Sequence, residues 1–529
     1  MNPDRPHAFT RRQALAAGLA AAGGLLAPRA VFPRATHPVV RTTYGDVRGF
    51  MDAGIAVFRG VRYGADTRPR RFMPPLPPAR WDVAADAFEY GAAAPQDRTG
   101  ERISEDCLFL NVWTPGLDDG RRPVMFYIHG GAYAHGSGSS PLYDGRRLAS
   151  TEDVVVVTVN HRLNAFGYLY LQRFGGPGLA DSGNVGQLDL VLALAWVRDN
   201  IAAFGGDPER VLAFGQSGGG AKIATMMAMP AAEGLFSRVA TMSGQQVTAS
   251  GPLNATRRTR AYLEALDVAP EDVARLRELP MERLVEALDT PDPVYDYGSV
   301  YFGPVLDMRS LTRHPFYPDA APQSAHIPMI IGNTHDETRA FLRGPRYENL
   351  EWDDLPELLV PNMRVDIRPE HVVETYRKLY PRLSPTEVFF KATTAARSWR
   401  AAIVEAEERA KLGRGNTYVY QLDWGSPVQP EMGAPHGLDI PLVFGNLDAP
   451  GSITGTGEDA RKVSTILQRA FAALARSGSP DHDGIPAWRP YTLPARETLV
   501  IDLPPRMEND PRGAERRLFA RVPYVQPGT

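Results

Sequence analysis

The stretch "RVLAFGQSGGGAKIATMMAM", residues 210–229, decides how this chain is interpreted. Its first part, "RVLAF", is apolar and predicts a β-strand, whereas "GAKIATMMAM" predicts a helix. Ser217 stands between them in a Gly-x-Ser-x-Gly string, and Gly215 and Gly219 leave room for a sharp turn. The string alone is weak evidence, because chance also produces it in a glycine-rich chain. Its place between a strand and a helix predicts a turn that lifts the Ser217 hydroxyl out of a sheet.

Other short β-prone runs have the same context, being followed by turn residues and often by a helical pattern. The strands predicted in this way are Val124–Ile128, Val154–Val159, Arg210–Phe214, Pro328–Gly332 and Thr417–Leu422. These runs are apolar throughout rather than alternating, which is typical of strands buried on both faces of a mainly parallel sheet.

Helical patterns separate these strands. Residues 186–204 place Leu190, Leu194 and Val197 on one helical face, and residues 270–289 look helical with a break at Pro280. We therefore predict an α/β fold with a doubly wound, mainly parallel central sheet flanked by helices. Helical insertions after the middle strands are expected to form a cap over a site at the carboxyl ends of the strands.

The composition is that of an ordinary soluble globular protein. Of the 529 residues, 43% are hydrophobic and 22% are charged, and the formal net charge is −3. This balance gives no basic surface for nucleic acid, so no nucleic-acid partner is predicted. Cys107 is the only cysteine, which excludes an intrachain disulfide and metal sites built from several thiolates.

The first 35 residues have a different pattern from the rest. Arg11 and Arg12 directly precede an apolar stretch, Ala14–Ala27, that is shorter than the ~20 residues of a membrane-spanning helix. The segment resembles a twin-arginine export signal, although Ala14 stands where that signal usually has Phe. It predicts a periplasmic or secreted protein, or a cytoplasmic one if the segment is only an Ala-rich extension. Residues 36–529 are predicted to form a single domain.

A second glycine-rich loop follows a predicted strand in "VMFYIHGGAYAHGSG", residues 124–138. Gly130, Gly131 and Ala132 can direct successive backbone N–H groups toward one point, as an oxyanion hole requires. The N–H groups after Ser217 lie at a helix N-terminus, whose partial positive charge also favours an anion. A simple glycine turn is the alternative for either loop alone, but together the two loops indicate a nucleophilic serine with an oxyanion hole.

These motifs resemble the type-B carboxylesterase and lipase family, a branch of the α/β-hydrolases that includes the cholinesterases. The resemblance covers nearly all of the chain after the N-terminal segment. The matching segments include, in the order of the family, "VFRGVRYG", "RFMPPLPPARW", "SEDCLFLNVWTP", "HGGAYAHGS", "FGQSGG", "FGPVLD", "GNTHDET" and "GAPHGLDIPLVFG".

The resemblance implies the partners of the serine. Glu337 in "GNTHDET" takes the position of the triad acid, with Asp336 as its neighbour, and His436 in "GAPHGLD" takes that of the general base. The chain order Ser217, Glu337, His436 is the order found in α/β-hydrolases. His436 would take the serine proton, and Glu337 would fix the tautomer of the imidazole.

The same resemblance gives the oxyanion hole to the backbone N–H groups of Gly131, Ala132 and Gly218. Ala132 stands where many members have a third glycine, and an alanine still donates its N–H. Gln216 replaces the glutamate that commonly precedes the nucleophile, which removes a carboxylate beside the serine. Gln216 is therefore a candidate substrate-binding residue.

Two aromatic residues are further candidates for substrate binding. Phe302, in "YFGPVLD", resembles a residue of the acyl pocket, and Trp399 is expected nearby; a role in the core is an equally good interpretation of both. Cys107 occupies the position of a family cysteine whose partner is replaced by Ala94. Cys107 is therefore expected to be a buried thiol that behaves as a small hydrophobic residue.

The leading hypothesis is a serine hydrolase that cleaves small-molecule carboxylic esters through an acyl-enzyme, without metal or organic cofactor. One alternative is a non-catalytic binding or adhesion protein, because the family includes members that have lost the triad. Another is a hydrolase that acts mainly on carbamates, amides or lactones, since the same nucleophile and oxyanion hole serve these bonds. The sequence leaves the physiological substrate and the oligomeric state open.

Overall fold

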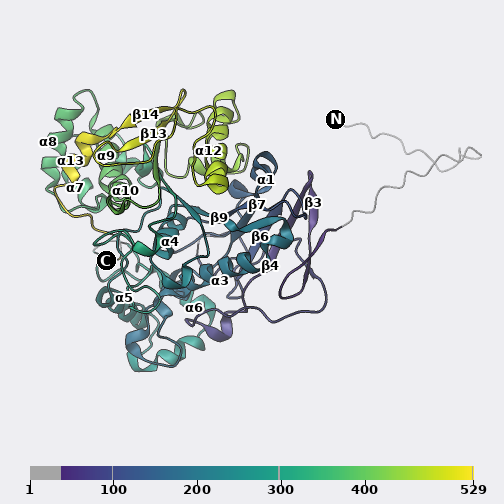
Figure 1. The fold of residues 1–529 in the computed structure, drawn as a ribbon. Coiled ribbons are helices and arrows are strands. Elements are labelled where there is room, and N and C mark those ends of the chain that lie inside the picture. The colour runs from purple at the N-terminus through teal and green to yellow at the C-terminus, as the bar shows by residue number, and fades with distance from the viewer. Residues whose placement is uncertain (1–36, 98, 296–297, 527, 529) are drawn as a thin grey trace, which may run out of the picture. The chain divides into compact units, whose positions relative to one another are not determined.

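An eleven-stranded sheet forms the centre of the computed structural model, which describes residues 37–529 except 98, 296–297, 527 and 529 (Figure 1). In spatial order its strands are β14 (Arg506–Asn509), β13 (Glu497–Ile501), β12 (Thr417–Leu422), β11 (Met329–Thr334), β10 (Arg238–Met242), β9 (Gly206–Gln216), β7 (Arg122–Ile128), β8 (Val155–Val159), β6 (Phe109–Thr114), β4 (Ile55–Arg62) and β3 (Phe50–Asp52). Neighbouring strands from β13 to β8 pair in parallel, and those at both edges pair antiparallel. The predicted fold class is thus confirmed.

The five predicted strands correspond to β7, β8, β9, β11 and β12. The strand β10 was not predicted, although it pairs with β9 and β11 in the middle of the sheet. A second, small sheet joins β1 (Val39–Arg41), β2 (Asp46–Arg48) and β5 (Ala85–Asp86). The predicted export signal lies outside the described residues.

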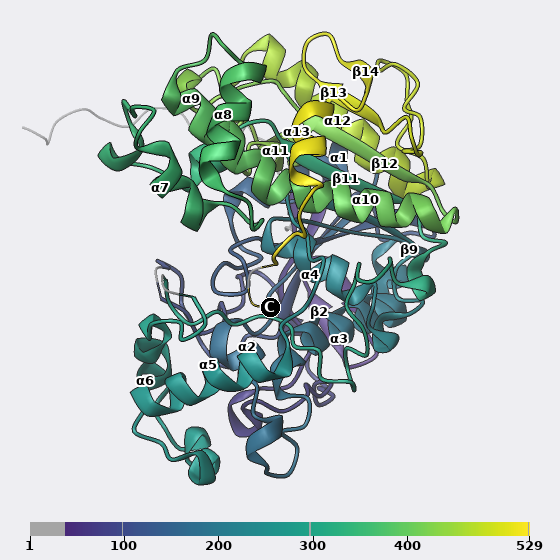
Figure 2. The same ribbon diagram turned by 90° about the vertical axis from the view of Figure 1, so that its left-hand side faces the viewer.

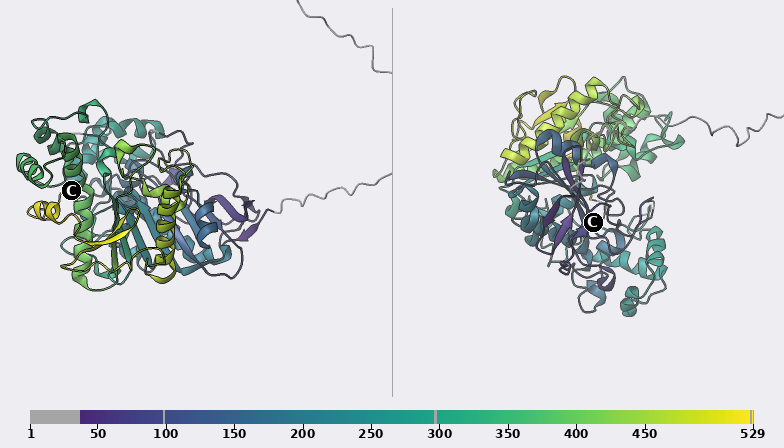
Figure 3. Two further views of the ribbon diagram at one scale, coloured as in Figure 1. Left: turned by 90° about the horizontal axis from the view of Figure 1, so that it is seen from above. Right: turned by 90° about the vertical axis from the view of Figure 1, so that its right-hand side faces the viewer.

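Helices cover both faces of the central sheet (Figure 3). The α-helices are α1 (Arg146–Glu152), α2 (Asn164–Tyr168), α3 (Val185–Asn200), α4 (Gly218–Met226), α5 (Pro252–Ala265), α6 (Met281–Glu286), α7 (Leu355–Leu359), α8 (Pro369–Leu379), α9 (Pro385–Thr394), α10 (Arg400–Leu412), α11 (Asp439–Phe444), α12 (Glu458–Ser477) and α13 (Gly513–Phe519). None of the helices in the described part of the chain is long and apolar enough to cross a membrane.

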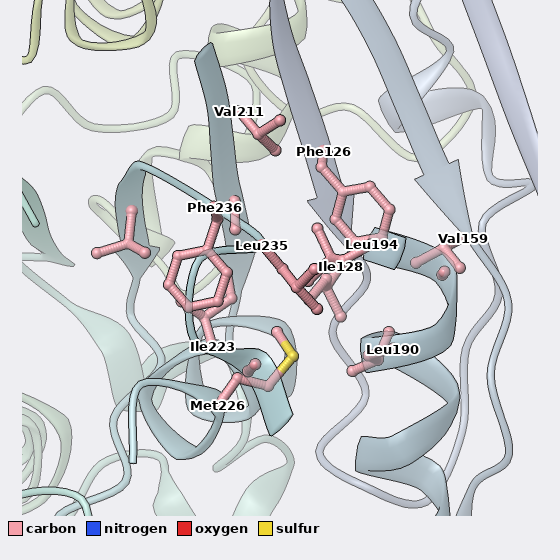
Figure 4. Packing of buried hydrophobic residues seen from close by; sticks show 14 of the residues in the cluster. Phe126, Ile128, Val159, Leu190, Leu194, Val211, Ile223, Met226, Leu235 and Phe236 are labelled. Atoms are coloured by element: carbon pink, nitrogen blue, oxygen red, sulfur yellow. The ribbon is translucent and has the colours of Figure 1, made fainter. Parts of the chain in front are cut away.

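The alternation of side chains along β7 shows why the sheet needs two helical layers. Phe126 and Ile128 point into the core cluster that contains residues of α3 and α4, whereas Met125 and Tyr127 point into the cluster that contains residues of α11 and α12. Figure 4 shows Leu190 of α3 in the first cluster with Phe126 and Ile128. Burial of each such side chain contributes about 1.5–3 kcal/mol to folding.

Two long insertions leave the sheet beside its middle strands. Residues 243–328 separate β10 from β11 and carry α5 and α6; residues 335–416 separate β11 from β12 and carry α7 to α10. Pro280 interrupts the first insertion as predicted, since residues 270–277 form a 3-10 helix and α6 begins at Met281. In Figure 2 helices α5 and α6 of the first insertion lie below, and helices α7 to α9 of the second insertion lie above.

The only cysteine is buried beside the sheet. Cys107 is fully buried and its thiol is free, and burial raises the pKa of this thiol well above its usual value. A protonated, enclosed thiol is unreactive, so Cys107 behaves as the small hydrophobic residue that the sequence predicted.

Candidate active site

Ser217 occupies the turn between β9, which ends at Gln216, and α4, which begins at Gly218. Its backbone has φ 55° and ψ −124°, a region that non-glycine residues rarely adopt and that costs of order 1–3 kcal/mol. The Ser217 N–H donates to the carbonyl of Met242 at 2.8 Å, so β10 helps to hold the strained turn. The serine is therefore fixed at the carboxyl end of the sheet.

The glycines of this turn are required by close backbone contacts. A Cβ atom at position 219 would lie 1.9 Å from the carbonyl oxygen of Ile128, and one at position 215 would lie 2.7 Å from the carbonyl carbon of Gly219. Both distances are below any tolerable contact, so no other residue fits without movement of β7 or α4. The two glycines therefore allow the strand and the helix to meet directly behind Ser217.

His436, which is partly buried, pairs with Glu337, which is fully buried at the start of the 3-10 helix Glu337–Ala340. The Nδ1 atom of His436 donates a hydrogen bond to Oε2 of Glu337, which fixes the tautomer with the proton on Nδ1. Oε1 of Glu337 accepts hydrogen bonds from the side-chain amide of Asn333 at 3.1 Å and from the N–H of Thr334 at 3.0 Å. All of these groups hold the carboxylate in one orientation.

The electrostatics of this pair keep Glu337 ionised. Burial by itself would raise the pKa of Glu337, but the nearby His436 and the hydrogen bonds that the carboxylate accepts outweigh it and lower the pKa below its usual value. On the other side of the imidazole, Nε2 of His436 is buried and has no hydrogen-bond partner among the described residues. This nitrogen is available to accept a proton.

Ser217 and His436 line the same cavity, whose volume is about 320 Å³. The cavity lies where strand ends and both insertions meet, and it is large enough for a small organic ligand. Its lining residues are Ala132, Tyr133, Ser217, Gly218, Ala221, Ser243, Gly244, Gln245, Gln246, Tyr301, Phe341, Arg364, Arg397, Ser398, His436, Tyr524 and Gln526.

The three predicted oxyanion-hole donors lie on two adjoining loops. No described residue accepts a hydrogen bond from the N–H of Gly131, Ala132 or Gly218, and the last two residues line the cavity. The loops meet closely, because a Cβ atom at position 218 would lie 2.0 Å from the carbonyl oxygen of Ala132. Lys222, fully buried on α4, donates to the same carbonyl at 2.6 Å and thereby anchors the loop.

The structure does not bring the other three predicted site residues to the cavity. Gln216 is buried behind it, with Nε2 unpartnered among the described residues. The ring of Phe302 packs edge-on against Tyr262, with 5.4 Å between centroids. Trp399 lies under the guanidinium of Arg512, 5.0 Å from its ring centroid. Any influence of these residues on substrate choice would act through the residues that line the cavity.

Sequence analysis missed several residues that do line it. Ser243, Gln245 and Gln246 directly follow β10, and a prediction of that strand would have drawn attention to them. Arg364 and Arg397 come from the second insertion, where no local pattern marks them. These residues contribute a hydroxyl, two side-chain amides and two guanidinium groups to the lining of the cavity.

A serine on a strand-to-helix turn, beside a histidine held by a carboxylate at the edge of a mainly parallel sheet, defines the α/β-hydrolase class. Comparison with known proteins identifies the branch. A model of the carboxylesterase family matches residues 36–519. The chain therefore belongs to the carboxylesterase family.

Individual relatives agree with this assignment over nearly their whole length. The chain is 34% identical over 501 residues to the para-nitrobenzyl esterase of Bacillus subtilis (strain 168), covering 91% of this chain and 98% of that protein. It is 33% identical over 491 residues to the phenmedipham hydrolase of Pseudarthrobacter oxydans, covering 88% and 95%. The crystal structure of a Geobacillus stearothermophilus carboxylesterase at pH 6.2 matches with a TM-score of 0.83 and 36% identity, covering 91% of this chain and 99% of that one. The protein is a carboxylic ester hydrolase.

Proposed function

We propose that Ser217, His436 and Glu337 are the catalytic triad of this esterase and that it cleaves small-molecule carboxylic esters through an acyl-enzyme. The observation that carries the proposal is the shared cavity, in which the unpartnered Nε2 of His436 and the strained Ser217 face one volume. Hydrogen bonds between nucleophile and base often tighten only when substrate binds.

Each residue has a defined step in this mechanism. Ser217 Oγ attacks the ester carbonyl carbon while Nε2 of His436 takes the hydroxyl proton. Collapse of the tetrahedral intermediate breaks the bond to the alcohol oxygen, which receives that proton from His436 and leaves. A water molecule then attacks the acyl group on Ser217, again with His436 as the base. The ionised Glu337 stabilises the imidazolium that forms in both halves of the reaction.

The oxyanion of each tetrahedral intermediate would be bound by the N–H groups of Gly131, Ala132 and Gly218. These donors are already oriented by the contact of the two loops, so little reorganisation opposes the reaction. The position of Gly218 at the start of α4 adds the favourable field of a helix N-terminus.

Replacement of the nucleophile tests the proposal. Ser217→Ala should lower kcat for a para-nitrophenyl ester by about 10⁴-fold or more while the protein stays folded, because acyl-enzyme formation is lost. It should also abolish covalent labelling by a fluorophosphonate probe. Ser237→Ala, at a partly exposed serine at the other end of β10, is the matched control and should keep both properties. Undiminished turnover in Ser217→Ala would refute the assignment.

We also propose that the protein is exported through a twin-arginine signal in residues 1–35. Arg11 and Arg12, followed by the apolar stretch Ala14–Ala27, support this proposal. Replacement of both arginines by lysine should keep the protein in the cytoplasm of its host, as measured by cell fractionation and by sequencing of the N-terminus. Full-length protein in the cytoplasm with or without the replacement would contradict export.

A further inference from the structure

The charges around the cavity are unequal. Arg364 and Arg397 both line it, together with His436, whereas no carboxylate is found among its described lining residues. The carboxylate of the proposed triad, Glu337, is fully buried and is already paired with His436. The described lining residues of this cavity therefore carry two guanidinium groups and no carboxylate.

Backbone contacts hold the two arginines next to each other. The N–H of Arg364 donates to the carbonyl of Ala396, the residue before Arg397, at 3.2 Å. The carbonyl of Arg364 accepts from the N–H of Val525 at 2.7 Å, and Val365 pairs with Tyr524. Three segments that are distant in sequence thus bring the two arginines and Tyr524 to one wall.

The environments of the two side chains place them within reach of a substrate. Nε of Arg364 is buried without a hydrogen-bond partner, and none of the described carboxylates pairs with this guanidinium. The guanidinium carbon of Arg397 lies 4.9 Å from the ring centroid of Phe341. That ring in turn lies 4.6 Å from the ring of His436, so Arg397 is one aromatic ring away from the proposed base.

Neutral donors in the same cavity complete the site. Nε2 of Gln245 is buried and unpartnered among the described residues, and Tyr301 and Tyr524 also line the cavity. A buried donor without an acceptor is costly, so this wall favours a ligand that supplies acceptor oxygens. A carboxylate supplies two and matches the geometry of a guanidinium.

We propose that Arg364 and Arg397 bind a free carboxylate of the substrate, so that the enzyme prefers esters carrying a second, ionised carboxyl group. This inference rests on the proposed function, because the ester carbonyl must reach Ser217 while the carboxylate lies on the arginine wall. The carboxylate can belong to the acyl part or to the alcohol part of the ester, and the test separates the two.

The test uses two pairs of isosteric substrates. In the acyl pair, para-nitrophenyl hydrogen adipate is compared with the para-nitrophenyl ester of adipic acid monoamide. In the alcohol pair, para-carboxyphenyl butanoate is compared with para-carbamoylphenyl butanoate. The acyl pair keeps the same leaving group, so its ratio of kcat/KM for acid over amide measures recognition of the carboxylate directly. In the alcohol pair the substituent also changes the leaving ability of the phenol, so that ratio is divided by the ratio of the two rates of alkaline hydrolysis. We expect a ratio of about ten or more in one pair.

Variants assign this preference to the arginines. Arg364→Gln and Arg397→Gln should each reduce the acid-to-amide ratio, and the double variant should bring it to about one. Because the ratio compares two substrates of the same variant, a general change of activity cancels from it. Arg368→Gln, an exposed arginine a few residues from Arg364 that does not line the cavity, is the matched control and should keep the ratio. Circular dichroism checks that each variant is folded.

The outcomes separate this inference from the proposed function. Hydrolysis of all four esters with a ratio near one in both pairs overturns the carboxylate preference and leaves the triad assignment intact. A preference that survives in the folded double variant also overturns the role of the arginines. Failure of the wild-type enzyme to cleave any para-nitrophenyl ester would instead contradict the proposed function.

Discussion

The cavity has two walls of different construction. The elbow wall, formed by Ala132, Ser217 and Gly218, presents backbone N–H groups and one hydroxyl at the ends of β7 and β9. The insertion wall, formed by Tyr301, Arg364, Arg397 and Tyr524, presents side chains from segments outside the sheet. The first wall supplies groups that any ester needs, and the second supplies groups that only some esters can use.

Packing explains why the two walls differ in tolerance to change. Behind the elbow wall the backbones of β7 and α4 approach so closely that even one methyl group does not fit. The insertion wall is joined by a few backbone hydrogen bonds between loops, which leave its side chains free to be replaced. Substitutions at the elbow wall should therefore affect folding and chemistry, whereas those at the insertion wall should affect substrate choice.

The largest effect is expected where the chemistry of the elbow wall depends on His436. Glu337→Gln keeps the size of the side chain but removes the charge that fixes the histidine tautomer, so kcat should fall by about 10³- to 10⁴-fold. The measurement is steady-state hydrolysis of a para-nitrophenyl ester by the folded variant.

Asp336→Asn is the matched control for this substitution, since Asp336 is the adjacent carboxylate. Its Oδ2 accepts from the N–H of Ala434 and does not contact His436 through any hydrogen bond in the described structure. We expect less than about a tenfold change in kcat. A larger loss of kcat in Asp336→Asn than in Glu337→Gln would contradict the assignment of Glu337 as the triad acid.

The next effect concerns the close packing behind the elbow wall. Gly219→Ala should lower the free energy of unfolding by about 3 kcal/mol or more, because the new methyl group meets the carbonyl of Ile128. Urea denaturation measures the change. Gly100→Ala, at a glycine whose Cβ would meet nothing within 4 Å, should leave stability nearly unchanged. Equal stability of the two variants would show that the elbow wall is not rigid.

The smallest effect concerns Glu405, a fully buried carboxyl on α10 behind the insertion wall. Burial raises the pKa of Glu405 from 4.5 to about 8, although the N–H of Gln246 donates to it at 2.7 Å. Because the pKa of Glu405 is higher in the folded state than in the unfolded state, the protonated carboxyl stabilises the fold fully at a pH below its unfolded pKa. This contribution to the free energy of unfolding is lost as the pH rises through about 8. Glu405→Gln should remove this loss.

We therefore expect Glu405→Gln to be more stable than the wild type by about 2 kcal/mol near pH 6, with a difference that grows toward pH 8, and to show little difference near pH 4. Thermal or urea unfolding at a series of pH values measures this dependence. Glu408→Gln on the same helix, where Glu408 pairs with Lys411 near the surface, should show no such gain. A parallel pH dependence of stability in Glu405→Gln and wild type would contradict the prediction.

The sequence predicted the elbow wall and five of the eleven strands of the central sheet, because their signals are local. Apolar runs predicted five strands, and the glycines around Ser217 predicted the turn. The strand β10 was missed because "RVATM" is short and contains an arginine and an alanine, so it is not a continuous apolar run; its pairing with β9 and β11 makes it a strand. With β10 unrecognised, Ser243 and the glutamines after it had no reason to be placed at the site.

The insertion wall could not be predicted for a different reason. Arg364 and Arg397 are brought together by a backbone hydrogen bond from Arg364 to Ala396, which lies in the π-helix Ala395–Trp399. No periodicity within either segment predicts this contact. The family resemblance was a guide to aromatic residues, but Phe302 packs on Tyr262 and Trp399 lies beneath Arg512. The family motifs thus placed Ser217 and His436 at the cavity correctly, but they did not identify the side chains that line the rest of it.

The hydrogen bond from Val525 to Arg364 has a consequence for the order of folding. The elbow wall joins the segments around Ala132 and Ser217, whereas the insertion wall closes only when the much later segment around Tyr524 has joined those at Arg364 and Ala396. Contacts of such long sequence separation form late, because the entropy of loop closure opposes them. During synthesis the turn at Ser217 would thus form before the insertion wall does. A preference among ester substrates would therefore indicate that the whole chain has folded.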